Sequence, residues 1–162
     1  HEPLALVVHL GAEVTEVLLI HNGVLVDTVS FPAGRNFLIR RLGELLETST
    51  VEATSALKLY TNESQHPAAN EKLRSTLEGI KIDWLKQFSE AVTTFLDHHL
   101  IPNGVWLVSD DGLLQIFTDW ISTGTFNDLV LGGGKFTPQV IKQAANSIEK
   151  DFYDTMLNHG RN

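Results

Sequence analysis

The sequence contains no cysteine, a single methionine and few basic residues. Without cysteine, disulfide bonds and thiolate-bound metal sites are both excluded. Twelve Lys and Arg residues against 20 Asp and Glu residues give a net charge of −8 at pH 7. Nucleic-acid-binding proteins carry a basic stripe, and the largest basic cluster here is only Arg35, Arg40 and Arg41. We therefore expect a protein partner or self-association, and no nucleic acid.

Long apolar runs are also missing. No run reaches the roughly 18 residues of a membrane span, and no basic segment leads into an apolar one at the N-terminus. We expect no direct membrane insertion and a cytoplasmic location, with any contact at the inner face of the membrane made through a partner. The 162 residues, 43% of them hydrophobic and 20% charged, predict one packed domain. A two-domain enzyme that closes on its substrate would need a longer chain.

Three antiparallel strands are predicted in the first part of the chain. Leu4–Val8 is an apolar run, and a second β-rich run covers Val14–Ile20. Asn22-Gly23 then supplies the positive φ angles of a tight hairpin turn. A third strand, Val24–Phe31, ends before Pro32 and Gly34. Residues 4–31 are therefore expected to form a β-meander.

Helices dominate the rest, with a helical segment at 35–100 and a βαβα segment at 104–162. Helix-period apolar residues or breaker residues place the remaining elements as follows: helices at 35–47, 50–60, 70–99 (with a break near Gly79), 113–121 and 138–158, and strands at 105–109 and 128–131. Apolar stripes expected to face the core are Leu38, Leu42, Leu45 and Leu46, then Ile82, Leu85, Phe88, Val92, Phe95 and Leu96, and Ile141 in the last helix. This order predicts an α/β domain with a mixed sheet and helices on both faces.

The turn after the first strand is the first candidate for chemistry. It contains Gly11, Ala12 and Thr15, and a small turn of this kind lets backbone N–H groups approach a phosphate. Tight turns use glycine for conformational reasons as well, so the turn alone leaves both readings open.

Several short motifs in the same order resemble the C-terminal lobe of the actin-like ATPase superfamily. They are His9–Thr15, the hairpin 17–31, Phe31-Pro32-Ala33-Gly34 opening a helix, Thr54–Lys58, and the strand and loop Val105–Leu113. The cell-division protein FtsA and the type IV pilus-assembly protein PilM are the most similar members. The resemblance implies an RNase-H-like single lobe, with nucleotide contacts at Gly11, Ala12, Thr15, Gly34, Lys58 and Gly112. It also implies that ATP and Mg²⁺ bind, if at all, in a longer parent protein.

Key positions of these motifs are altered. His9 stands where the family has the aspartate of its phosphate loop, Ser55 replaces an acid near the ribose, and Asp110 and Asp111 replace glycines of the adenosine loop. Imidazole is a poor ligand for a hard cation, and two carboxylates beside a nucleotide would repel its phosphates. The sequence therefore favours a scaffold lobe that acts through protein–protein interaction, without catalytic residues. The alternative is the nucleotide-contacting half of an active ATPase or kinase.

Other readings of the same residues carry less weight. Asp110 or Asp111 can simply cap the next helix, and adjacent carboxylates point apart, which disfavours a metal or acid–base pair. A nuclease of the RNase H type needs a carboxylate where His9 stands. His98 and His99 are neighbours on different faces of a helix, which disfavours zinc. Gly132–Lys135 lacks the remaining residues of a P-loop and is expected to be a connection.

Overall fold

The computed structural model describes residues 4–62, 71–109, 113–126 and 134–141. The meander is as predicted: β1 (Leu4–Leu10), β2 (Thr15–His21) and β3 (Val24–Phe31) pair antiparallel. Asn22 and Gly23, with φ angles of 54° and 79°, form the hairpin turn between β2 and β3. The Asn-Gly prediction is thereby confirmed, because these are the residues that adopt positive φ at least cost.

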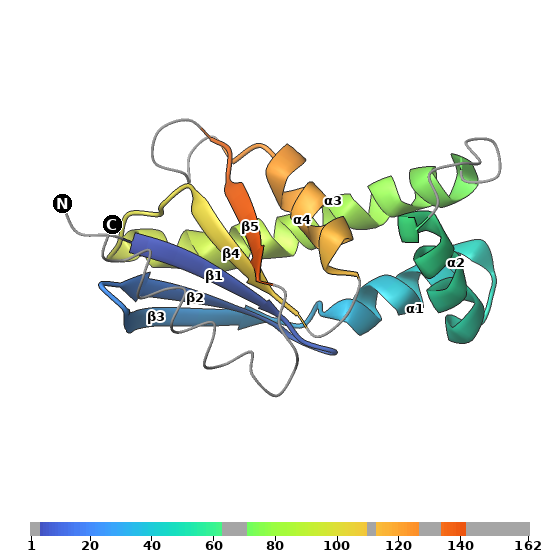
Figure 1. Ribbon diagram of the computed structural model, residues 1–162, viewed down its shortest axis with the longest axis horizontal. Coiled ribbons are helices and arrows are strands. Elements are labelled where there is room, and N and C mark those ends of the chain that lie inside the picture. The colour runs from blue at the N-terminus through green and yellow to red at the C-terminus, as the bar shows by residue number, and fades with distance from the viewer. Residues whose placement is uncertain (1–3, 63–70, 110–112, 127–133, 142–162) are drawn as a thin grey trace.

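Two parallel strands extend the meander. β4 (Gly104–Val108) pairs with β1, and β5 (Thr137–Ile141) pairs with β4, which gives the sheet order β3-β2-β1-β4-β5 (Figure 1). The helix predicted to begin at Pro138 is wrong over 138–141, where the chain is a strand. Proline suits both a helix start and an edge strand, and β5 lies at the edge of the described sheet. The rest of that predicted helix and the strand predicted at 128–131 lie outside the described residues.

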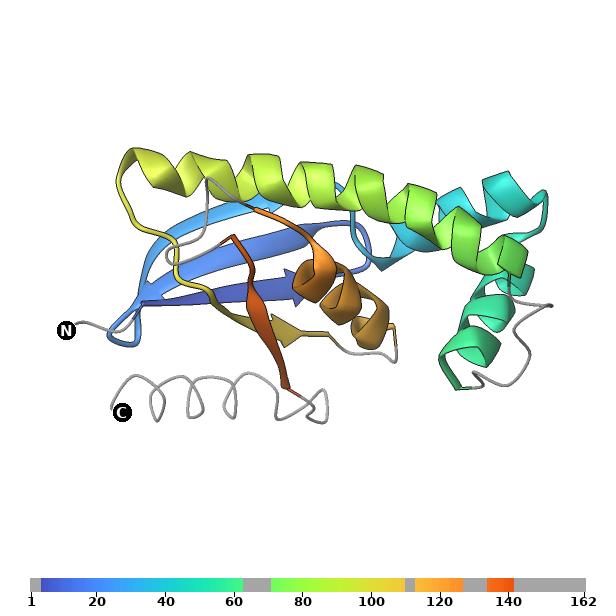
Figure 2. The same cartoon turned by 90° about the horizontal axis from the view of Figure 1, so that it is seen from above.

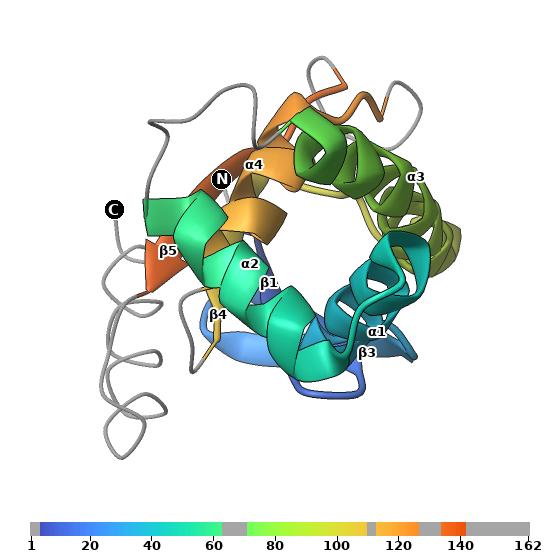
Figure 3. The same cartoon turned by 90° about the vertical axis from the view of Figure 1, so that its right-hand side faces the viewer.

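The described helices are α1 (Arg35–Leu46), α2 (Thr50–Asn62), α3 (Glu71–Thr93) and α4 (Leu114–Thr123), with a 3₁₀ turn, η1 (Thr94–Asp97), after α3. Figure 2 shows α3 running the length of the sheet on one face, with α4 beside it. Helices α1 and α2 extend beyond the end of the sheet, and Figure 3 views the molecule from that end. The break predicted near Gly79 is absent, since α3 continues through this exposed position. None of the described helices is long and apolar enough to cross a membrane.

The main core lies between the sheet and α3. The fully buried Trp84 stacks on Phe88 with ring centroids 5.4 Å apart and meets Phe31 of β3 edge-on at 5.5 Å. The buried face of α3 consists of Leu73, Leu77, Ile80, Trp84, Phe88, Ala91 and Val92. The prediction that Ile82 faces the core is therefore wrong, since it is 69% exposed, and Leu45 of α1 is also exposed. A smaller buried cluster on the opposite face of the sheet contains Val7, Ile20, Val108 and Ile141.

Candidate functional site

The turn between β1 and β2 meets the start of α1. The N–H groups of Arg35 and Asn36 donate to the carbonyl oxygens of Gly11 and Ala12, both at 2.9 Å, and the N–H of Gly34 donates to the carbonyl of Glu13 at 3.3 Å. The first N–H groups of a helix have no partner within the helix. Here the backbone of the turn caps α1, and no side chain does so. Residues 11–13 and 34–36 thus form one continuous piece of structure, named the turn–helix junction below.

Glycine at position 34 makes this junction possible. A Cβ atom on Gly34 would lie 2.4 Å from the carbonyl oxygen of Gly11 and 2.6 Å from that of Ala12. Both neighbours are backbone atoms, so a side chain would have to push the whole turn away. Gly11 is similarly close-packed, because its Cβ would lie 2.7 Å from the carbonyl oxygen of Val14, to which its own N–H donates.

An ion pair on the surface closes the junction from outside. The guanidinium of Arg40 donates to both carboxylate oxygens of Glu13, at 3.2 and 2.8 Å, and the Nδ2 of Asn36 donates to Oε1 at 2.8 Å. Two hydrogen bonds, the one from Arg40 with the larger effect and the one from Asn36 with the smaller, lower the pKa of Glu13 to about 2. Because Glu13 and Arg40 are exposed, this pairing orders the turn more than it stabilises the fold.

Two buried donors fix the junction from inside. Thr15, which is fully buried, donates its hydroxyl proton to the carbonyl of Ala33 at 2.8 Å. The Nε1–H of Trp84 donates to the same carbonyl oxygen at 2.9 Å. This one backbone oxygen therefore joins β2 and α3 to the segment that leads into α1. The hydroxyl of Thr15, which the sequence predicts to contact a phosphate, already makes a structural hydrogen bond.

The predicted site residues do not all come together. Gly11, Ala12, Thr15 and Gly34 meet at the junction. His9 lies half-buried at the end of β1, opposite Glu16 and beside Val108. Figure 1 shows α2, which carries the exposed Ser55 and Lys58, at the far end of the molecule beyond α1. Asp110, Asp111 and Gly112 lie outside the described residues.

The remaining chemistry of the junction is limited. Within the described ranges, the N–H groups of Ala12 and Glu13 donate no hydrogen bond, so these two donors are available to an anion. Mg²⁺ prefers oxygen ligands, whereas His9 offers a ring nitrogen. No group of three or more His, Asp or Glu side chains among the described residues is placed to hold a metal ion. The described residues therefore fit a weak anion contact better than a Mg-nucleotide site.

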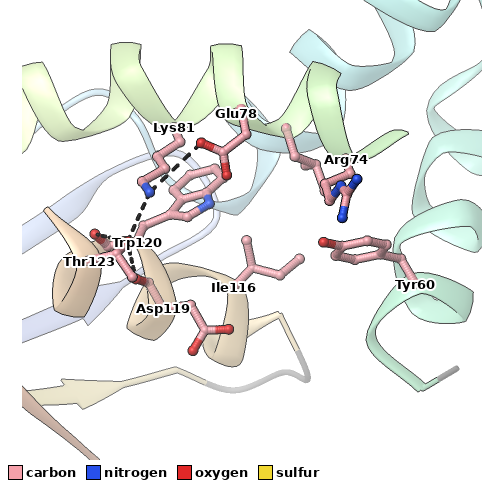
Figure 4. A pocket seen from close by; sticks show the side chains of 9 residues that line it. Tyr60, Arg74, Glu78, Lys81, Ile116, Asp119, Trp120 and Thr123 are labelled. Atoms are coloured by element: carbon pink, nitrogen blue, oxygen red, sulfur yellow. Dashed lines mark hydrogen bonds and ion pairs between the residues drawn. The ribbon is translucent and has the colours of Figure 1, made fainter. Parts of the chain in front are cut away.

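A separate hollow of about 220 Å³ lies between α2, α3 and α4. Figure 4 shows its polar lining, in which Lys81 bonds the hydroxyl of Thr123 at 2.9 Å and lies 3.9 Å from Glu78. The lining residues are Tyr60, Arg74, Leu77, Glu78, Lys81, Ile116, Asp119, Trp120 and Thr123. None of the residues predicted to bind nucleotide belongs to it, and its two cations have carboxylate partners, Glu78 for Lys81 and Glu71 for Arg74.

Sequence reasoning missed the residues that hold the junction together. Glu13 and Arg40 are far apart in the sequence, and no spacing rule joins a turn residue to the second turn of a later helix. Arg40 forms a basic cluster in the sequence with Arg35 and Arg41, yet Arg41 also pairs with a carboxylate, that of Asp83, at 3.2 Å. Only the bond from Trp84 could have been expected from the sequence, because the N–H of a buried indole needs a hydrogen-bond acceptor.

Neither a protein-family profile nor a curated protein sequence matches this chain. Solved structures do match. The ethanolamine utilization protein EutJ from Carboxydothermus hydrogenoformans has a TM-score of 0.54 and 20% identity, over 83% of this chain and 44% of that one. The PilM–PilN type IV pilus biogenesis complex has a TM-score of 0.53 and 14% identity, over 97% of this chain and 44% of the matched chain.

Identities this low establish a shared fold and nothing finer. Both matched proteins belong to the actin-like ATPase superfamily, and PilM is one of the two proteins that the sequence motifs resemble. The chain spans less than half of the length of either matched chain. The protein therefore has the mixed α/β fold of a single lobe of the actin-like ATPase superfamily.

Proposed function

We propose that this chain is a protein-binding lobe of an actin-like assembly protein, and that its nucleotide motifs have lost their function. The observation that carries the proposal is that the carbonyl groups of the turn and the side chains of Glu13 and Arg40 already pair within the turn–helix junction. The N–H groups at the start of α1 bond the turn, and Arg40 bonds Glu13. Among the described residues, an arriving phosphate gains two backbone donors at Ala12 and Glu13, while the guanidinium of Arg40 is already bonded to Glu13.

Two further features support partner binding. The net charge of −8 disfavours nucleic acid and leaves proteins as the partner class. PilM, one of the structural neighbours, was solved in a complex with PilN. By analogy, the chain is expected to bind another protein, with peripheral membrane contact only through that partner.

The experiment that tests this proposal restores the altered position. His9→Asp supplies the carboxylate of the family motif, and His98→Asp, at an exposed position far along the chain, is the control with the same change of residue. In a calorimetric titration of Mg-ATP, we expect no binding by the unaltered chain or by H98D, and measurable binding by H9D. Tight binding by the unaltered chain would contradict the proposal, and no gain in H9D would argue against a phosphate loop at this turn.

The second candidate is the nucleotide-contacting half of an active ATPase or kinase. The observation that favours it is the pair of available N–H groups at Ala12 and Glu13, presented by a turn that Gly34 holds in place. On this reading, ATP with Mg²⁺ binds between this lobe and a second lobe of a longer protein. ATP hydrolysis by that longer protein, abolished by Gly34→Val, would establish the second candidate and remove the first.

A further inference from the structure

The outer edge of β3 is open in the described part of the chain. β3 pairs with β2 on one side, and no described strand lies on its other side (Figure 1). An edge strand presents a row of N–H and C=O groups without strand partners, which is a template for another extended chain.

The start of this edge is apolar and exposed. Val24, Leu25 and Val26 are consecutive and are 62%, 54% and 40% exposed. The imidazole Nε2 of His99 lies 3.5 Å from Oδ2 of Asp27, which brings the segment after α3 against the same strand, and Leu100 in that segment is 60% exposed. A run of three exposed apolar residues at a sheet edge is a liability unless it is covered by a partner.

The usual protections of an edge strand are incomplete here. Asp27 is the only charged residue of β3, and its carboxylate faces His99. A bulge leaves Val26 as an extra residue, because Leu19 is opposite Asp27 while Ile20 is opposite Leu25. The bulge disturbs the ladder only at this point, and the stretch 27–31 remains regular. A segment that pairs with this stretch would extend over the apolar residues beside it.

We propose that the outer edge of β3 binds an extended segment of a partner protein, with apolar residues at alternate positions and Lys or Arg at its flanks. The open backbone groups require an extended segment, and Val24, Leu25 and Val26 require apolar side chains. The flanking cations follow from the charge of −8 and from Asp27 and Asp97 at this end of the molecule. The same charge opposes a second copy of this chain as the occupant. The inference rests on the proposed protein-binding role and locates its interface.

The test uses a defined peptide and the full chain. The probe has about nine residues, alternating Val and Thr between pairs of Lys, and a second peptide carries Glu in place of Lys. Binding is measured by titration and by hydrogen exchange of the backbone amides at 24–31. We expect the Lys peptide to protect amides of β3, and the Glu peptide to bind at least about tenfold more weakly.

Matched variants complete the experiment. Val26→Lys should weaken binding of the Lys peptide at least about tenfold, while Ile82→Lys, at a position of α3 that is 69% exposed, adds the same charge and should leave it unchanged. Absence of protection, equal loss in both variants or equal binding of both peptides would overturn the inference. If the chain sediments as a dimer and V26K dissociates that dimer, the inference of a partner protein would be overturned in favour of a second copy of this chain at the edge. Because these readouts involve no nucleotide, a negative result removes this interface and leaves the Mg-ATP titration to decide the proposed function separately.

Discussion

Replacing Gly34 by alanine tests the packing of the turn–helix junction directly. The backbone of Gly34 has a φ of −90°, which alanine adopts freely, so conformational strain does not contribute. The new methyl group would lie 2.4 and 2.6 Å from two carbonyl oxygens, those of Gly11 and Ala12. The turn must then move away, which stretches the hydrogen bonds that Arg35 and Asn36 donate to it.

The expected cost follows from these two effects. Overpacking costs about 1–3 kcal/mol, and each weakened backbone hydrogen bond contributes about 0.5–1.5 kcal/mol. Since movement of the turn relieves the clash while it breaks the bonds, we expect a loss of about 2–4 kcal/mol in the free energy of unfolding. In a protein of this size, that loss lowers Tm by roughly 5–15 °C.

Urea unfolding followed by tryptophan fluorescence measures this loss. Gly79→Ala is the matched control, because a Cβ atom at this exposed position of α3 has no neighbour within 4 Å. It should stabilise the chain by about 0.5–1 kcal/mol, since alanine is the better helix former. If G34A were as stable as the unaltered chain to within about 0.5 kcal/mol, the close-packed junction would be refuted.

Three further substitutions test the contacts around the junction. The pKa of the Glu13 carboxyl is lowered from 4.5 to about 2, so its carboxylate stabilises the fold above about pH 4.5 and this contribution is lost as the pH falls toward 2. Arg40→Gln should remove that part of the pH dependence in acid unfolding curves, and an unchanged curve would count against the pairing. Thr15→Val removes the buried bond to the carbonyl of Ala33 and should lower the free energy of unfolding by about 1–2 kcal/mol in urea titrations, whereas a neutral result would mean that this bond adds nothing. Trp84→Phe should destabilise the chain by about 1–3 kcal/mol in the same assay, through the lost Nε1–H donor and the lost ring volume, and a wild-type midpoint would contradict its role as a link.

Local chemistry made much of the sheet and most of the helix positions predictable. Asn22 and Gly23 occur where only a tight turn fits between two β-rich runs, and the structure places that turn there. Ser49 accepts a hydrogen bond from the N–H of Glu52 and caps α2, and serine directly before a helix is a common capping residue. Such features depend on a few consecutive residues, which is why they can be read from a single sequence.

The errors concern features that tertiary contacts decide. Two overlapping apolar stripes exist on α3, and the position of Phe31 on the sheet selects the one with Trp84 over the one with Ile82. Pro138 is compatible with a helix start as well as with an edge strand, and pairing with β4 selects the strand. At the junction, the glycine positions were predictable from motif order, but the Glu13–Arg40 pair depends on where α1 leaves the turn.

Calorimetric titration of Mg-ATP into the unaltered chain, and into any longer protein that contains it, tests the central claim most directly. The carbonyl groups of the turn and the side chains of Glu13 and Arg40 are already paired within the turn–helix junction, and His9 replaces the carboxylate. We therefore predict that neither protein binds Mg-ATP with a Kd below about 1 mM, which corresponds to about −4 kcal/mol. Micromolar binding by either protein would contradict the account.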